Sequence, residues 1–452
     1  MEPGSGPPHR SDQAFFGQPR GLLTLCGLEV WERFSFLGMQ AILVLYFADT
    51  VTHGGMGMSA GTAASVSAAY GTLVHLVSVV GGRLADRILG SYRAVLWGGI
   101  LIACGHYAMA VPTAGMTWVG LGLISAGTGL LKPDVATMVG KLYRTDDNRR
   151  DAGFALSYMA INIGAFAGPL FTGWLGDHRG WHWGFSAAAI GMTLGLVQYV
   201  AGRRHLAGRK HAAEVTPPPD SPTLECARAG EPPPHQAIRV VAAGPVVAGL
   251  VATAVIAVRL AAADRLTVDR FVDLLTLVSV IATIAYFAVM FTSPRVTPEE
   301  RGRLRPYIVL LLASTVFNFV LFQAYSTMML ASTNTERSIL GFHFPAGWYA
   351  SALGAFEVAL APAVAALWVR TRRRQPHASN KIAIGGVLGG LSFLLMVLPT
   401  LGQSAEGHLM SVLYDDVSQP AYFGVNGAIA VAAGLAVTAA APWLRRTMHP
   451  VH

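Results

Sequence analysis

Long hydrophobic runs alternate with short polar stretches along most of this 452-residue chain. About 20 apolar residues in a helix cross the hydrocarbon core of a bilayer, and twelve runs approach or exceed that length. They cover residues 21–49, 60–87, 92–112, 116–141, 150–176, 182–203, 236–261, 267–292, 303–333, 344–370, 380–401 and 419–447. The pattern predicts an all-α polytopic membrane protein with about 12 transmembrane helices.

Basic residues gather in alternate loops between these runs. The loops at 50–59, 112–116 and 402–418 contain no Lys or Arg, and the loop at 176–181 contains only Arg179. The alternate loops are rich in basic residues, and the 262–266 turn with Arg265 is the mild exception. Cytoplasmic loops carry an excess of Lys and Arg, so both termini are expected in the cytoplasm. Only 13% of the residues are charged and 53% are hydrophobic. The net charge of +8 comes from basic residues in alternate loops and does not indicate nucleic-acid binding. We expect a multi-pass protein of the cell membrane.

Composition also divides the chain into segments. The stretch between the sixth and seventh runs is rich in proline and cannot form a packed core, so it is interpreted as a cytoplasmic linker. The predicted segments are an N-terminal tail (1–20), a six-helix bundle (21–203), the linker (204–235), two further helices (236–292), a four-helix bundle (293–447) and a cytoplasmic tail (448–452).

Three charged side chains interrupt the first hydrophobic run. Glu29, Glu32 and Arg33 are spaced i, i+3 and i+4, so they share one helix face. Lipid cannot solvate this face, which favours a functional role over an ion pair that only fixes helix packing. The three charges sum to one negative charge, and Lys132 in the fourth run is the candidate cation. The alternative for Lys132 is snorkelling to the interface. Carboxylates beside a lysine form a coupled titrating system, as proton coupling requires.

Two other stretches carry candidate chemistry. The loop after the second run contains Asp86, Arg87 and Arg93, whose charges can form and break a latch between conformations. The alternative is an ordinary positively charged turn. In the fifth run Tyr158 and Asn162 are spaced i, i+4 on one face, where they can hydrogen-bond a ligand or a neighbouring helix.

These motifs together resemble the proton-dependent oligopeptide transporter family of the major facilitator superfamily. The resemblance covers most of residues 21–200 and rests on the Glu29-x-x-Glu32-Arg33-Phe34 run, the Gly-Leu-Leu-Lys132-Pro stretch and segments 157–164 and 180–185. It implies two helical bundles, with two inserted helices at 236–292, and substrate bound between the bundles.

The resemblance also implies roles for individual residues. Residues matching Glu29, Glu32, Arg33 and Lys132 take part in proton coupling in the family, and those matching Tyr158 and Asn162 line its peptide site. The loop with Asp86, Arg87 and Arg93 resembles the superfamily's signature gating loop.

Several pocket positions depart from the family's pattern. Gln40 stands where the family usually has an arginine that can hold the peptide carboxylate, and an uncharged amide cannot form that charge-assisted pair. His75 replaces a pocket tyrosine, and Phe36 and Leu37 replace a tyrosine pair of the first-helix motif.

The second half departs further. Asn318 and Gln323 fall where the seventh helix usually has a Trp and then a Glu-Gln pair. Glu357 lies in the eighth helix, where the family is apolar. It is either a relocated acid or the partner of a donor facing the bundle. The family also has two more helices before the last one, one of which holds the peptide amine, and here only residues 402–418 intervene.

The function that these features predict is proton-coupled symport of di- or tripeptides, or of related small solutes, by alternating access. Two alternatives remain open: a divergent relative that carries or exports a non-peptide solute, and a non-transporting remnant. An enzyme is not expected, because His-Glu-x-x-His and Gly-x-Ser-x-Gly motifs are absent from the sequence. We expect no cofactor besides the proton gradient, no metal, a small-molecule substrate and the lipid bilayer as partners, no nucleic acid, and a monomer.

Overall fold

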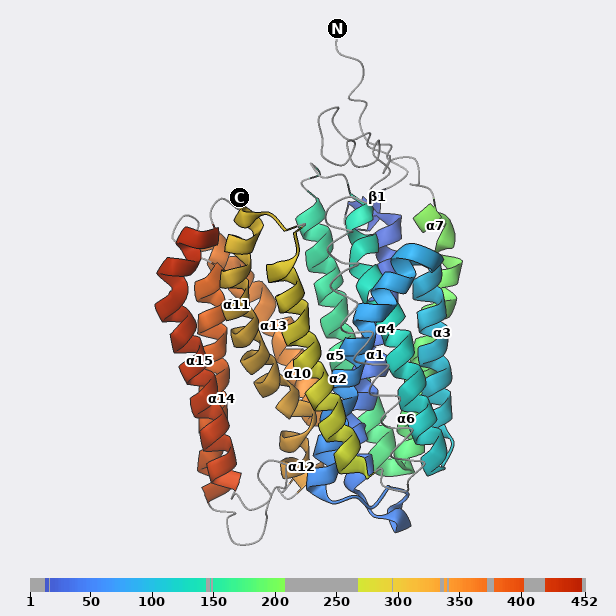
Figure 1. Cartoon of the computed structure of the whole chain (residues 1–452). Coiled ribbons are helices and arrows are strands. Elements are labelled where there is room, and N and C mark those ends of the chain that lie inside the picture. The colour runs from blue at the N-terminus through green and yellow to red at the C-terminus, as the bar shows by residue number, and fades with distance from the viewer. Residues whose placement is uncertain are drawn as a thin grey trace. The chain divides into compact units, whose positions relative to one another are not determined.

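The computed structural model describes residues 13–15, 17–143, 147, 149–207, 267–294, 296–333, 337–339, 341–371, 378–401 and 419–448. These residues are almost entirely helical (Figure 1). The run predicted at 236–261, most of the predicted linker and the 402–418 stretch lie outside the described residues.

Most of the predicted runs correspond to long helices. They are α1 (Arg20–Ala48), α2 (Ala60–Leu84), α3 (Ser91–Ala110), α4 (Ala114–Lys141), α5 (Arg150–Arg179), α6 (Trp181–Ala201), α10 (Val268–Thr292), α11 (Pro298–Phe322), α13 (Trp348–Thr371), α14 (Ala378–Leu401) and α15 (Gln419–Met448).

Short elements connect these helices. Five are brief helical turns: η2 (Val51–His53), η3 (Ala85–Leu89), α7 (Arg203–Ala207), η4 (Gln323–Tyr325) and α12 (Thr327–Thr333). The others are two antiparallel hairpins, β1 (Gln13–Phe15) with β2 (Gln18–Pro19) and β3 (Ser338–Ile339) with β4 (Phe342–His343).

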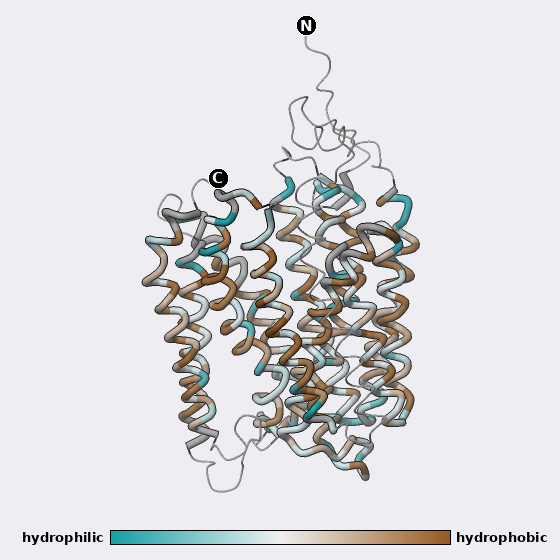
Figure 2. Tube along the Cα trace, viewed as in Figure 1, coloured by the Kyte–Doolittle hydropathy of each residue, from teal (hydrophilic) through white to brown (hydrophobic). Residues whose placement is uncertain are grey.

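The described helices present apolar side chains outward. Eight of them are long and apolar enough to cross a membrane, and hydrophobic residues colour much of their length in Figure 2. Ile284, Leu312 and Leu388 are each more than 60% exposed. Surfaces of this kind need lipid around them, whereas a monomer in water rarely exposes large apolar patches. The full count of about 12 spans stays a prediction, because part of the chain is not described.

The chain forms two compact units. The first comprises residues 1–42, 73–225 and 350–359, and the second comprises residues 43–72, 226–349 and 360–452. Each unit is built from helices in close contact.

Glycines allow the helices of the first unit to pack with their backbones close together. A Cβ added to Gly127 of α4 would lie 2.5 Å from the carbonyl oxygen of Gly98 on α3. On α5, a Cβ at Gly164 would lie 2.4 Å from the carbonyl oxygen of Val30 on α1. Larger residues at these positions would push the helices apart. The α5 contact fixes the part of α1 that carries the charged residues.

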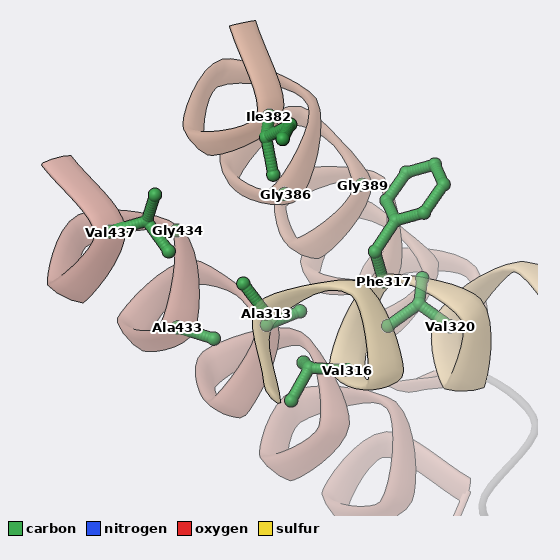
Figure 3. Close-up of a pocket in the computed structure, with 11 residues that line it drawn as sticks. Ala313, Val316, Phe317, Val320, Ile382, Gly386, Gly389, Ala433, Gly434 and Val437 are labelled. Carbon is green, nitrogen blue, oxygen red and sulfur yellow. The ribbon is translucent and has the colours of Figure 1, made fainter. Parts of the chain in front are cut away.

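Helices α11, α14 and α15 form the core of the second unit. Their buried cluster contains Val320, Phe393, Tyr422, Phe423 and Ala430. A small pocket lies among the three helices (Figure 3). Every residue that lines it is apolar: Ala313, Val316, Phe317, Val320, Ile382, Gly386, Gly389, Ala430, Ala433, Gly434 and Val437. Such a surface has no group that could recognise a polar solute.

One predicted run is interrupted in the structure. The 303–333 stretch forms α11, the 3₁₀ turn η4 and α12 in place of one continuous helix, and Ser326 has non-helical dihedrals (φ −131°, ψ −94°). Hydropathy does not distinguish a broken helix from a continuous one. The polar side chains at the break form a network with α15, described below, which the apolar pattern does not reveal.

Candidate functional site

The charged residues of α1 form a buried ion pair. The Arg33 guanidinium donates two hydrogen bonds to the Glu32 carboxylate, from Nε to Oε2 and from Nη2 to Oε1, the latter at 2.8 Å. Glu32 is only 1% exposed and the Arg33 side chain 12%. Charge-assisted bidentate pairs of this kind are stronger than hydrogen bonds between neutral groups. The buried carboxylate thus has its partner on its own helix.

Lys132 on α4 lies beside this pair. Its ammonium is 5.6 Å from the centroid of the Phe36 ring on α1, and the guanidinium carbon of Arg33 is 5.5 Å from the same centroid. Glu29 is partly buried and interacts electrostatically with Arg33, Glu32 and Lys132. We call Glu29, Glu32, Arg33 and Lys132 the ion cluster. Its formal charges cancel, and Lys132 contacts α1 rather than snorkelling away from it.

The predicted pocket residues of the first unit differ in exposure. Asn162 on α5 is 3% exposed, and its side chain has no hydrogen-bond partner within the described residues. Tyr158, one turn earlier, is 55% exposed. Gln40 on α1 is buried, whereas His75 on α2 is exposed. The sequence places Tyr158 and Asn162 on one face, and the structure adds that only Asn162 is enclosed.

The predicted residues of α11 and η4 lie in contrasting surroundings. Asn318 is exposed and donates from its own amide to the carbonyl oxygen of Ser314 at 2.8 Å. Gln323 is 6% exposed, and its Oε1 accepts a hydrogen bond of 3.0 Å from the hydroxyl of Tyr422 on α15. The same hydroxyl lies 3.3 Å from Oγ1 of Thr327. We call Gln323, Thr327 and Tyr422 the hydroxyl network.

Glu357 lies on the part of α13 that belongs to the first unit. It is partly buried and has no ion-pair partner among the residues that the structure describes. One turn before it, Gly354 packs directly on α5, where an added Cβ would lie 2.7 Å from the backbone nitrogen of Phe166. An unpaired carboxylate in a membrane helix is a candidate functional group.

The predicted latch is described only in part. The loop forms the π-helical turn η3, and Gly90, with φ of 71°, ends it before α3 begins. Arg93 is exposed, while the side chains of Asp86 and Arg87 lie outside the described residues. The latch itself therefore stays a prediction.

Three residues that make these contacts, Phe36, Thr327 and Tyr422, are not among the sequence candidates. In the sequence Phe36 is only a departure from a tyrosine, and no pattern along the chain predicts its contact with two cations. Tyr422 had no signal at all, because nothing along the sequence connects it to Gln323, 99 residues away. Within the described residues no group of three or more His, Cys, Asp or Glu side chains could hold a metal ion.

Comparisons with known proteins agree on one family. The model of the POT family matches residues 92–419. The chain is 37% identical over 393 residues to the uncharacterized transporter YclF of Bacillus subtilis, covering 86% of this chain and 75% of that protein. It is also 37% identical over 409 residues to a di-/tripeptide transporter of Lactococcus lactis subsp. cremoris, covering 88% of this chain and 79% of the relative.

Solved structures show the same similarity. The crystal structure of a peptide transporter POT in complex with sulfate superposes with a TM-score of 0.79 at 34% identity, covering 97% of each chain. The predicted fold class, an all-α polytopic membrane protein of the major facilitator type, is thereby confirmed, as is the family resemblance of the motifs.

Proposed function

This chain belongs to the POT family, and we propose on that premise that it is a secondary transporter that moves di- or tripeptides, or related small solutes, together with protons. Members of the family are transporters rather than enzymes, and the chain is an integral membrane protein. We further propose that it acts as a monomer in the plasma membrane, with both termini in the cytoplasm. The loop charges support this orientation.

The ion cluster is the observation that carries this proposal. The Glu32 carboxylate is 1% exposed and paired with Arg33, and Lys132 interacts electrostatically with both residues. Protonation of Glu32 or Glu29 would thus loosen the contact between α1 and α4. A group that is protonated in one conformation and paired in another couples proton movement to the change between them.

The substrate would meet the residues that the family resemblance assigns to the pocket. We propose that Tyr158 and Asn162 contact the peptide, and that Gln40, His75, Asn318, Gln323 and Glu357 set the preferences that differ from the family pattern. Asn162 supports this assignment, because its side-chain amide makes no hydrogen bond within the described residues and is therefore available to a ligand.

Uptake into proteoliposomes tests the function directly. Purified protein is reconstituted, and accumulation of labelled dialanine is measured with an inward proton gradient, without a gradient, and with a protonophore. We expect accumulation only with the intact gradient. Folded protein that binds no dialanine and accumulates none would contradict peptide transport.

A second candidate function has one specific observation behind it. Gln40 is a buried amide at the position where the family usually has an arginine for the peptide carboxylate. A solute without that carboxylate would suit this pocket better. Competition of dialanine uptake by peptide amides and by other small amines separates this candidate from ordinary peptide transport.

A further inference from the structure

The Phe36 ring contacts two cations from two helices. The Arg33 guanidinium is 5.5 Å and the Lys132 ammonium 5.6 Å from its centroid, and the ring is only 6% exposed. Arg33 and Phe36 are spaced i, i+3 on α1, so their side chains are neighbours on one face. Lys132 approaches the same ring from α4. A single aromatic side chain therefore joins the cations of the ion cluster.

This contact links Lys132 to α1. Lys132 makes no ion pair with any carboxylate whose side chain the structure describes, although Glu29, Glu32 and Arg33 all act on it electrostatically. Arg33 repels it. The negative face of an aromatic ring attracts both cations, and this attraction is larger where water is excluded. The ring can thus hold Lys132 near a like charge without a direct salt bridge.

We propose that Phe36 is a positioning residue for proton coupling. It keeps the Lys132 ammonium next to Arg33 and within electrostatic range of Glu29 and Glu32. Protonation of either carboxylate therefore changes the electrostatic force on Lys132 and so on α4. Holding the Lys132 ammonium requires the π face of the ring and no hydroxyl, so phenylalanine can hold it as well as tyrosine can. The coupling role rests on the proposed function, whereas the contact itself does not.

Transport assays test the coupling role. Phe36→Leu keeps an apolar side chain but removes the ring, and Phe36→Tyr keeps the ring. Phe34→Leu is the matched control, because Phe34 lies on the same helix and its ring packs on Gly191 of α6. Each variant is first checked for a monodisperse profile in detergent, and Phe36→Met replaces Phe36→Leu if the latter fails that check.

The expected pattern separates coupling from folding. Phe36→Leu should lower the maximal rate of gradient-driven uptake at least about fivefold, while its KM and its rate of substrate exchange change little. Exchange moves no net protons, so it should depend less on the ion cluster. Phe36→Tyr, which keeps the ring, should retain the gradient-driven uptake of the wild type. Equal driven uptake in the Leu and Tyr variants, or an equal loss of driven uptake and exchange, would overturn the proposal.

A stability measurement tests whether the Phe36 ring contacts the Lys132 ammonium, and it does not require that the protein transports. Melting temperatures are compared for wild type, Phe36→Leu, Lys132→Met and the double variant. If the ring holds the ammonium, the two losses should be less than additive, because either change removes the same contact. The cycle of Phe34→Leu with Lys132→Met should be additive. If the losses of melting temperature in the Phe36 and Lys132 variants were additive, the contact would be refuted. If they were less than additive but the wild-type protein showed no uptake, only the proposed function would be refuted.

Discussion

Glu32 and Arg33 are consecutive residues of α1, and their side chains pair with each other. Consecutive residues on a helix point about 100° apart, so both side chains must bend toward one side to meet. Room for this comes from α5. A Cβ added to Gly164 would lie 2.7 Å from the Cβ of Arg33. Because Gly164 has no side chain, the Cβ of Arg33 can lie against the α5 backbone while the guanidinium reaches the Glu32 carboxylate.

Neutralising Glu32 should abolish proton coupling. Glu32→Gln keeps the shape but leaves Arg33 with an uncharged partner in a buried place, and breaking a buried pair costs about 3–5 kcal/mol. We expect gradient-driven uptake to fall at least about tenfold, with exchange retained. The control is Asp49→Asn, an acid in the segment after α1, which should behave as wild type. Full driven uptake by the Gln variant would exclude Glu32 from coupling.

Lys132 should be required for driven uptake in the same way. Lys132→Met keeps the length of the side chain but removes the charge that cancels one carboxylate of the ion cluster. Gradient-driven uptake should be lost while the protein remains folded. Lys141, on the same helix, is exposed and bonds Ser91 at 3.2 Å, so Lys141→Met is the matched control and should transport normally. Equal activity of the two variants would remove the special role of Lys132.

An arginine at position 40 should change substrate preference. Gln40→Arg offers a charge-assisted, bidentate partner for a carboxylate, worth about 1.5–3 kcal/mol when made. We expect KM for dialanine to fall, with no such change for dialanine amide. The measurement is uptake of both substrates over a concentration series. If both KM values stay unchanged, Gln40 does not face the peptide carboxylate.

The hydroxyl network should stabilise the second unit. Tyr422→Phe removes the hydrogen bond to Gln323 and leaves that buried amide short of a partner, which costs about 1–3 kcal/mol. The melting temperature in detergent should therefore drop. Tyr307→Phe, which removes an exposed hydroxyl from α11, is the control and should leave it unchanged. A drop of the same size in both variants would argue against the network.

Alanine substitutions at two glycines of α4 should change the stability of the protein in opposite directions. Gly127→Ala would place a Cβ 2.5 Å from the carbonyl oxygen of Gly98, so α3 and α4 would have to separate, at a cost of about 1–3 kcal/mol. At Gly122 an added Cβ meets nothing within 4 Å, and alanine should stabilise the helix slightly. Thermal unfolding of the two variants checks this contrast, which would fail if Gly127→Ala were as stable as Gly122→Ala.

The sequence predicted most of the local structure, whereas the functional roles that it predicts for individual residues stay predictions. Hydrophobic runs gave the long helices because a chain in lipid must satisfy its backbone hydrogen bonds within each segment. Charges inside α1 and α4 marked the ion cluster, because their burial in lipid is costly. The sequence did not predict the break at Ser326, because polar residues of that kind also occur within continuous helices.

By itself, the sequence determined that this chain is a helical membrane protein with a charged cluster on its first helix. The tertiary structure decided which groups meet: Arg33 turns to Glu32, Lys132 reaches Phe36, and Tyr422 bonds Gln323. These contacts depend on how closely helices approach and on how they are rotated. Both are set by small residues such as Gly98, Gly127 and Gly164, whose partners lie on other helices, so the pattern along one helix cannot specify them.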